Sequence, residues 1–210
     1  YTTLFRSDLT QCRLADNEGQ AALRYLRDLY ATHGTEGGAW LAGGINPDQG
    51  FVTGRYAMVL SGPWNLKAFR QVNFGVTLVP ASPQRKSASN IGGSAMVVFR
   101  QSKRAQEAYR FLEYLVSPEV QTMWSRGTGQ LSVSRRANAA LAATMSAEMK
   151  VFLEQLDYAG GRPQLPGYDS LELITGPYLY SALDGSLPID DALKKACRET
   201  ESDLLRKMVP

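Results

Sequence analysis

The chain has 210 residues, of which 44% are hydrophobic and 20% are charged, and its formal net charge at pH 7 is +3. These proportions are ordinary for a globular protein with a substantial core, and the scattered Lys and Arg residues exclude a strongly basic nucleic-acid-binding surface. No apolar run approaches the roughly 18 residues that a transmembrane helix needs. Cys12 and Cys197 lack metal-ligand spacing, so they either form a structural pair or stay two buried thiols.

The first seven residues, Tyr1–Ser7, are unlike the start of a natural protein. The chain begins with Tyr instead of Met, and it carries no recognisable signal peptide. The peptide YTTLFRS is what a common short-read sequencing adapter encodes. We therefore expect Tyr1–Ser7 to be a non-native leader, with further native chain upstream. The alternative is a natural N-terminal strand.

The first half of the chain predicts helices that alternate with strands. A helix is expected from about residue 16 to Gly34, because leucines recur at helical spacing, and a glycine-rich loop follows. Pro47 begins a short helix over 47–53. Strands are expected where apolar runs are bounded by glycine or proline, over 56–60, 74–80 and 92–100.

The second half predicts helices only. Ser102 is expected to cap one helix, and Ser117 with Pro118 to begin the next, which ends at Gly127. In this second helix Val120, Met123 and Trp124 are expected to face inward. Further helices are predicted over 135–145, 146–157, 169–185 and from 188 onward. Strands that alternate with helices indicate an α/β architecture.

Catalytic patterns are absent from the sequence, which contains no GxSxG, HExxH, P-loop or GxGxxG motif. The single histidine, His33, lies at a predicted helix C-terminus, where its charge complements the helix dipole. Tyr178 and Tyr180 are two positions apart on a helix, so they point to different sides and make a poor metal site. We expect no enzyme activity, no catalytic residue, no metal and no cofactor.

Five motifs follow one another in order. They are FxxGRYAMVLSGPW (51–64), NFGVTLVP (73–80), IGGS (91–94), SKRAQEAYRFLEYLVSPEVQ (102–121) and TGQL (128–131). Together they resemble the family 1 extracellular solute-binding proteins of ABC importers, which are relatives of maltose-binding protein. The resemblance covers the chain from Asp8 onward, and the closing helices also match the family.

The resemblance implies an α/β, periplasmic-binding-protein-like fold of two lobes that close over a ligand. This chain looks like the C-terminal half of such a protein. Residues 8–93 and 132–210 are expected in the C-terminal lobe, and 94–131 in a helical excursion into the N-terminal lobe. Without the rest of that lobe, the helices over 103–126 are expected to expose Phe111, Leu115 and Trp124.

The implied function is to bind a sugar, either a disaccharide or an oligosaccharide, in the cleft between the lobes. Its partners are expected to be this carbohydrate and the transmembrane subunits of the permease, with no nucleic acid. The protein is expected to be a monomer and extracytoplasmic, in the periplasm or lipid-anchored at the outer face of the membrane, its signal sequence lost by truncation. The same fold binding a glycerol phosphate diester is the alternative, and a sugar-active enzyme is a distant one.

The resemblance also implies the ligand-binding residues. Trp64 is expected to project from the Gly-Pro corner and stack on a pyranose ring, the alternative being a core position. Gly92 and Gly93 are expected at the crossing between lobes, where they permit hinge dihedrals, and Ser94 offers a hydroxyl to the cleft. Arg162 is expected to reach sugar hydroxyls, or else to form a surface salt bridge.

Four further positions refine these expectations. Glu172 stands where maltose-binding members carry an aromatic residue that contacts sugar, which casts doubt on a maltodextrin ligand. We still expect Glu172 to bind the ligand, because a carboxylate can accept from sugar hydroxyls. Ser132 stands where the family has proline, and we expect it to loosen that crossing. Trp124 is expected in the core, whereas the role of Trp40 is open. A phosphate ligand calls for clustered basic residues, of which only Arg162 is evident.

Overall fold

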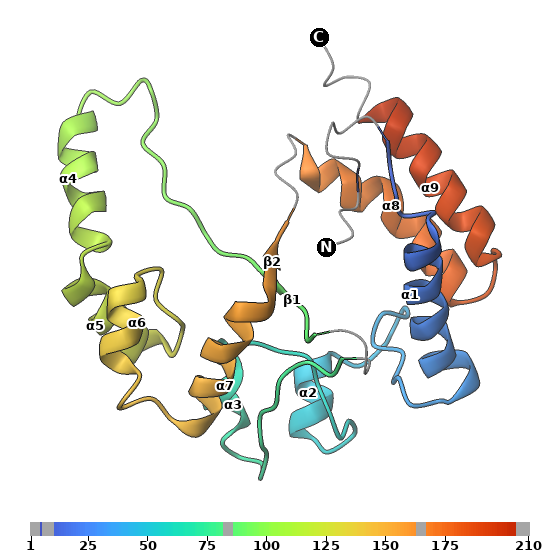
Figure 1. Ribbon diagram of the computed structural model, residues 1–210, viewed down its shortest axis with the longest axis horizontal. Coiled ribbons are helices and arrows are strands. Elements are labelled where there is room, and N and C mark those ends of the chain that lie inside the picture. The colour runs from blue at the N-terminus through green and yellow to red at the C-terminus, as the bar shows by residue number, and fades with distance from the viewer. Residues whose placement is uncertain (1–4, 6–10, 82–85, 163–166, 205–210) are drawn as a thin grey trace. The chain divides into compact units, whose positions relative to one another are not determined.

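The computed structural model describes residue 5 and residues 11–81, 86–162 and 167–204. The chain forms two compact units, of which one comprises 1–44 with 163–210 and the other 45–162 (Figure 1).

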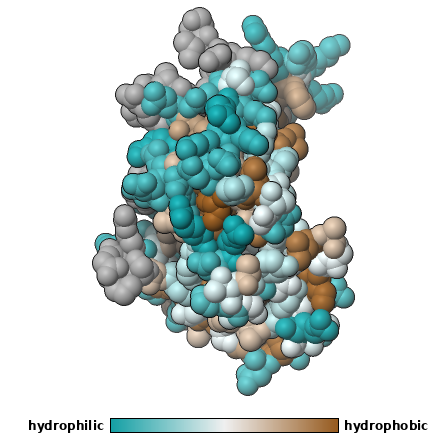
Figure 2. Space-filling view, turned by 90° about the vertical axis from the view of Figure 1, so that its right-hand side faces the viewer, coloured by the Kyte–Doolittle hydropathy of each residue, from teal (hydrophilic) through white to brown (hydrophobic). Residues whose placement is uncertain are grey.

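The first unit is built from helices whose apolar faces meet. They are α1 (Asn17–Arg27), continued by the π-helical turn η1 (Asp28–Thr32), α8 (Tyr168–Leu183) and α9 (Ile189–Asp203). Leu23, Ala182 and Leu193 are buried together at their contact. The outward face of α9 is polar, whereas α1 exposes Tyr25 and Leu26 beside its polar residues. Hydrophilic residues dominate the upper part of the face shown in Figure 2. The amphipathic pattern predicted these helices correctly.

A disulfide joins Cys12 to Cys197, with 5.2 Å between the Cα atoms. The pairing settles the question that the sequence leaves open. The backbone N–H of Cys12 also donates to Oε1 of Glu201 at 2.9 Å, so a second bond holds the segment before α1 to α9.

Phe5 lies in the same unit, where its backbone forms an isolated antiparallel β-bridge with Cys12. Its side chain packs in a buried cluster with Leu171 and Leu204. Such packing is what a natural N-terminal strand would show. The other residues of Tyr1–Ser7 lie outside the described part of the chain, so the leader stays a prediction.

The second unit is mostly helical. Its α-helices are α2 (Pro47–Val52), α3 (Leu66–Phe69), α4 (Ala105–Leu115), α5 (Pro118–Thr128), α6 (Arg135–Leu141) and α7 (Ala147–Gln155), and its 3-10 turns are η2 (Pro63–Asn65) and η3 (Leu156–Tyr158). The side chains of Ser117, Ser134 and Ser146 accept hydrogen bonds from the first turns of α5, α6 and α7, as N-cap residues do. The helices of this region were therefore predictable.

Two helix boundaries differ from the expectation. Helix α4 begins after Arg104, whose N–H donates to the hydroxyl of Ser102, so Ser102 lies before the cap. Helix α5 ends at Gly129 instead of Gly127, because Gly129 is the residue with positive φ (71°). A left-handed residue after a helix is where glycine is most favoured.

The predicted strands over 56–60, 74–80 and 92–100 are wrong: the structure assigns no strand to these residues. The strands of the described part are β1 (Ser89–Ile91) and β2 (Ala159–Gly161), which run parallel side by side (Figure 1). Backbone groups of the 74–80 segment bond to side chains instead: the N–H of Val79 donates to Gln155, and its carbonyl accepts from Ser87. An apolar run becomes a strand only where another strand satisfies its backbone.

The apolar faces of α4 and α5 lie exposed in this chain. Phe111 is 53% and Trp124 54% exposed, as expected from the sequence, whereas Leu115 is half-buried. Of the residues of α5 expected to face inward, only Val120 is buried, and Met123 is exposed together with Trp124. Amphipathicity identifies which face is apolar but not whether another element covers it.

Candidate ligand-binding site

Trp64 stands on a tight corner between the extended 56–61 segment and α3. The N–H of Asn65 donates to the carbonyl of Gly62 at 3.1 Å, which closes the turn around Pro63. A Cβ atom on Gly62 would lie 2.1 Å from the indole ring of Trp64, so the ring rests against this backbone and only glycine fits beneath it. Trp64 is nevertheless 59% exposed, which rules out the core position.

Asp48 holds both sides of this corner. Its Oδ1 accepts from the hydroxyl of Ser61 at 3.1 Å, and its Oδ2 accepts from Nδ2 of Asn65 at 2.6 Å. Asn65 also donates to the Ser61 hydroxyl at 2.8 Å. Asp48 is itself fixed in the first turn of α2, where its N–H donates to the N-cap Asn46. The clamp formed by Asp48, Ser61 and Asn65 thus fixes the backbone that carries Trp64.

Helix α3 continues from the corner and is anchored by an aromatic cluster. Phe69 is buried, and its ring centroid lies 4.9 Å from that of Phe51 and 5.9 Å from that of Phe74. Because this face of the short helix is occupied, Lys67 and Arg70 on the same helix stay exposed.

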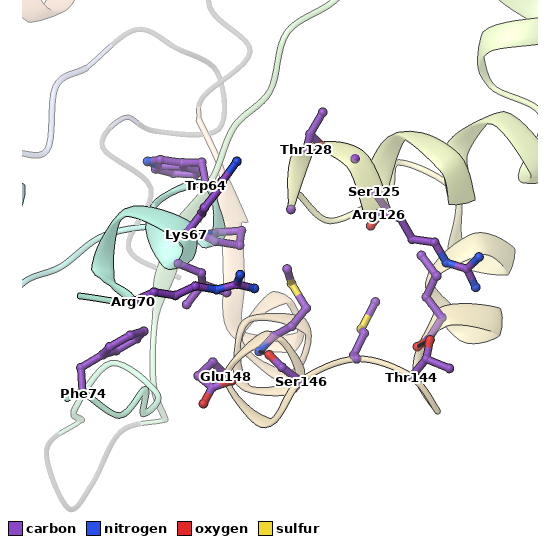
Figure 3. A pocket seen from close by; sticks show the side chains of 17 residues that line it. Trp64, Lys67, Arg70, Phe74, Ser125, Arg126, Thr128, Thr144, Ser146 and Glu148 are labelled. Atoms are coloured by element: carbon purple, nitrogen blue, oxygen red, sulfur yellow. Dashed lines mark hydrogen bonds between the residues drawn. The ribbon is translucent and has the colours of Figure 1, made fainter. Parts of the chain in front are cut away.

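A cavity of about 550 Å³ lies beside Trp64 within this unit (Figure 3). Its lining comes from three stretches of chain: the corner with α3, the end of α5, and the α6–α7 connection. The lining residues are Pro63, Trp64, Leu66, Lys67, Arg70, Phe74, Ser125, Arg126, Gly127, Thr128, Gly129, Leu141, Thr144, Met145, Ser146, Glu148 and Met149. This mixture of apolar surface with a few polar groups is typical of small-molecule sites.

Basic residues outnumber acidic ones in the lining of the cavity. Lys67 and Arg70 extend from α3 toward the open space in Figure 3, and Arg126 lines the side formed by α5. Glu148 is the one carboxylate among the described lining residues. A hydrogen bond from the hydroxyl of Ser146 holds the pKa of Glu148 below its ordinary value, so this group is ionised at neutral pH. The sequence did not indicate that basic residues gather here.

The end of α5 is held near the corner by glycine and by a buried serine. The Ser125 hydroxyl donates to the carbonyl of Gln130 at 2.5 Å, which fixes the turn after the helix. A Cβ atom on Gly129 would lie 3.9 Å from the carbonyl oxygen of Pro63, so α5 ends beside the Trp64 corner.

Ser132 does not loosen the chain that follows α5, contrary to expectation. It is buried, its N–H donates to Oδ1 of Asn138 at 2.9 Å, and its carbonyl accepts from Nδ2 of Asn138 at 2.9 Å. Its hydroxyl donates to Oε1 of Gln121, also at 2.9 Å. Proline has no N–H and could not complete this network, so the departure from the family pattern is compensated locally.

None of the other predicted site residues lines the cavity beside Trp64. Gly92, Gly93 and Ser94 follow β1 as exposed chain and do not line the cavity. Neither glycine has a positive φ, so neither adopts a conformation that requires glycine. Arg162 follows β2, and the pairing of Ile91 with Gly161 brings it to the same end of the sheet as Gly92. Glu172 is an exposed residue of α8, in the other unit.

Trp40 has a packing role in the first unit. Its ring lies 5.1 Å from Tyr30 in an edge-on arrangement and 6.2 Å from Tyr180 in a stacked one. Its indole N–H donates to Glu36 at 2.9 Å. Tyr178 bonds instead to Glu199, so Tyr178 and Tyr180 point to different partners, as expected. Within the described residues, no group of three or more His, Cys, Asp or Glu side chains could hold a metal ion.

Residues 5–152 match the family model described as "Bacterial extracellular solute-binding protein". The chain is 29% identical over 138 residues to a maltooligosaccharide ABC transporter solute-binding lipoprotein of Streptococcus pneumoniae. That match covers 62% of this chain and 31% of the relative. The helices of the described part are all too short or too polar to cross a membrane.

Solved structures of sugar-binding proteins share the fold. The sugar-binding protein MalE from Xanthomonas citri superposes with a TM-score of 0.81 at 23% identity, over 98% of this chain and 53% of that one. MalX from Streptococcus pneumoniae, solved with maltopentaose, gives a TM-score of 0.79 at 20% identity, over 98% and 55%. At these identities the likeness concerns the fold alone, and it confirms the predicted periplasmic-binding-protein-like fold. The chain spans about half the length of these solved proteins.

The family match extends over more than half of the chain. The chain belongs to the family of bacterial extracellular solute-binding proteins.

Proposed function

We propose that this chain is part of the substrate-binding subunit of an ABC importer and that it binds a disaccharide or an oligosaccharide against Trp64. The observation that carries the proposal is the exposed indole of Trp64, which lines a cavity and stands on a clamped corner. The relatives named above support the ligand class, since one is named for maltooligosaccharide and another was solved with maltopentaose.

The chemistry of a sugar suits this surface. A pyranose carries C–H groups on its faces and hydroxyls around its edge, so it stacks on an aromatic ring and bonds to polar groups beside it. Thr128, Thr144 and Ser146 line this cavity together with its aromatic and aliphatic residues and carry hydroxyl groups. The clamp limits the freedom of the corner, which lowers the entropy cost of stacking.

The remaining parts of the function follow from this assignment. The bound sugar is delivered to the transmembrane subunits of a permease, and the protein works as a monomer outside the cytoplasm, either in the periplasm or anchored by lipid. Residues 8–93 and 132–210 belong to the C-terminal lobe and 94–131 to the N-terminal lobe. Gly92, Gly93, Ser94, Arg162 and Glu172 remain secondary candidates for contacts with the sugar.

The test is calorimetric titration of the chain with maltotriose, with Trp64→Ala as the variant. If stacking removes about 100 Å² of apolar surface from water at ~25 cal/mol per Å², the loss is roughly 2.5 kcal/mol. That is somewhat under a hundredfold in affinity. The melting temperature should change little, because the side chain is mostly exposed.

Trp124→Ala is the matched control. Trp124 is 54% exposed, lies in the same unit and does not line the cavity, so its removal should leave maltotriose affinity unchanged. Equal affinity of the Trp64→Ala variant and the unaltered chain would overturn the proposal, as would an equal loss in both variants.

A further inference from the structure

Three cationic side chains line the cavity beside Trp64 against one carboxylate. They are Lys67, Arg70 and Arg126, and the carboxylate is Glu148. The salt bridges within the described residues lie elsewhere, at Arg13–Asp16 and Lys194–Asp190, so no carboxylate of the described part of the chain forms an ion pair with these three cations. A cavity lined in this way has a positive potential that concentrates anions.

Lys67 and Arg70 are placed for a ligand that already contacts Trp64. Positions 64, 67 and 70 follow one another at intervals of three along η2 and α3, and residues at this spacing share one helical face. In Figure 3 both cationic side chains extend from α3 into the space beside the corner. A shallow depression on the same helix is again lined by Trp64, Lys67 and Arg70.

Arg126 has a structural reason for its position, since it lies in the last turn of α5, where a cation complements the helix dipole. Lys67 lies on α3, a helix of only four residues whose dipole is small, and Arg70 is the C-cap residue that follows it. A neutral sugar has no need of two uncompensated cations, whereas an anionic group is bound by the forked guanidinium of Arg and the point charge of Lys.

We propose that the ligand is an acidic carbohydrate, whose ring stacks on Trp64 while its anionic oxygens bind Lys67 and Arg70. The anionic group is the carboxylate of a uronic acid or a phosphate ester, since both offer the oxygen acceptors that these cations bind. The inference rests on the proposed sugar site and adds the charge of its ligand.

The first experiment compares three probes on the full chain: maltose, its counterpart oxidised to a terminal glucuronate, and maltose 6′-phosphate. At low salt at least one acidic probe should bind roughly tenfold more tightly than maltose, as expected for charge-assisted hydrogen bonds. The advantage should shrink at ~0.5 M salt, because these cations are exposed and screened. The acidic probe with the larger gain in affinity over maltose shows whether the anionic group is a carboxylate or a phosphate.

Equal binding of maltose and both acidic probes would overturn this inference and leave the sugar site intact. Failure of all three probes to bind would overturn the proposed function itself, and the inference with it. The two failures are therefore distinguishable within one set of titrations.

The second experiment uses Lys67→Gln and Arg70→Gln. Each should reduce the affinity for the preferred acidic probe roughly threefold to tenfold, while the affinity for maltose stays the same. Lys150→Gln and Arg110→Gln are the controls, because they remove the same charges from exposed positions of the same unit that do not line the cavity. Equal losses in the controls would indicate only the net charge of the chain and would overturn the assignment.

Discussion

At the scale of single residues, the position of Trp64 depends on an acidic side chain far from it in sequence. Asp48 accepts from Ser61 and from Asn65, which lie on the two sides of the Gly62–Pro63 turn. Nothing in the sequence around Asp48 marks this role, since an acidic residue in the first turn of a helix is favoured by the dipole alone. The partners become evident only when the chain folds back on α2.

Asp48→Ala should loosen this corner. Loss of the carboxylate leaves the Ser61 hydroxyl and the Asn65 amide without their shared acceptor, which should cost about 1–3 kcal/mol of folding free energy. Sugar affinity should fall as well, because Trp64 is no longer held. Chemical denaturation and sugar titration measure the two effects.

Asp48→Asn serves as the conservative variant, because its amide oxygen still accepts one of the two bonds. It should recover part of the affinity. An Asp48→Ala variant that binds sugar like the unaltered chain would show that the clamp does not position Trp64.

The tryptophans show what sequence reasoning can decide. Trp64 follows a Gly-Pro break, which cannot continue a strand or helix, so its projection from the chain was predictable. Trp124 was assigned to the core from an amphipathic pattern, yet it is exposed. The contacts of Trp40 with Tyr30 and Tyr180 join residues distant in sequence, and no local pattern encodes them.

At the scale of elements, helices were predictable and strands were not. A helix forms its backbone hydrogen bonds within its own segment, and N-cap residues mark where it begins. Ser117 before Pro118 and Ser146 before α7 are examples. A strand needs a partner, and the apolar segment 56–60 has none in the described part of the chain. The strands that form, β1 and β2, contain Asn and Gly, residues that strands disfavour.

Ser146→Ala tests a cap that also contributes to the cavity. The hydroxyl accepts from the N–H of Met149 at 3.2 Å, so its loss should destabilise α7 by about 1 kcal/mol. The same substitution removes the main cause of the lowered pKa of Glu148, which should therefore rise toward the ordinary value.

The sign of the pH effect follows from this shift. A carboxyl group whose pKa is lower in the folded state stabilises the fold above its unfolded pKa, and that contribution is lost as pH falls through the folded pKa. The Ser146→Ala variant should therefore lose less stability on acidification than the unaltered chain. Titration of the Glu148 side chain by NMR checks the pKa directly, and an unchanged value would contradict the assignment.

At the scale of the whole molecule, the disulfide joins segments 185 residues apart in sequence. A cross-link that closes so long a loop restricts the unfolded chain strongly, which corresponds to about 3–5 kcal/mol. Its presence agrees with a family of extracellular proteins, because disulfides persist in oxidising surroundings.

Replacing Cys12 and Cys197 with serine should lower the denaturation midpoint accordingly. A reducing agent should have the same effect on the unaltered chain and none on the double variant. If reduction leaves the midpoint of the unaltered chain unchanged, the bond does not contribute to stability.

The central claim is that sugar binds at the Trp64 corner, and the indole N–H signals of the chain test it most directly. The sequence contains three tryptophans, Trp40, Trp64 and Trp124, so a 15N spectrum resolves one indole signal for each and single substitutions assign them. On titration with maltotriose and its acidic counterparts, the Trp64 signal should shift in a saturable manner while the Trp40 and Trp124 signals stay in place. A saturable shift of Trp40 or Trp124 with Trp64 unmoved would contradict the account.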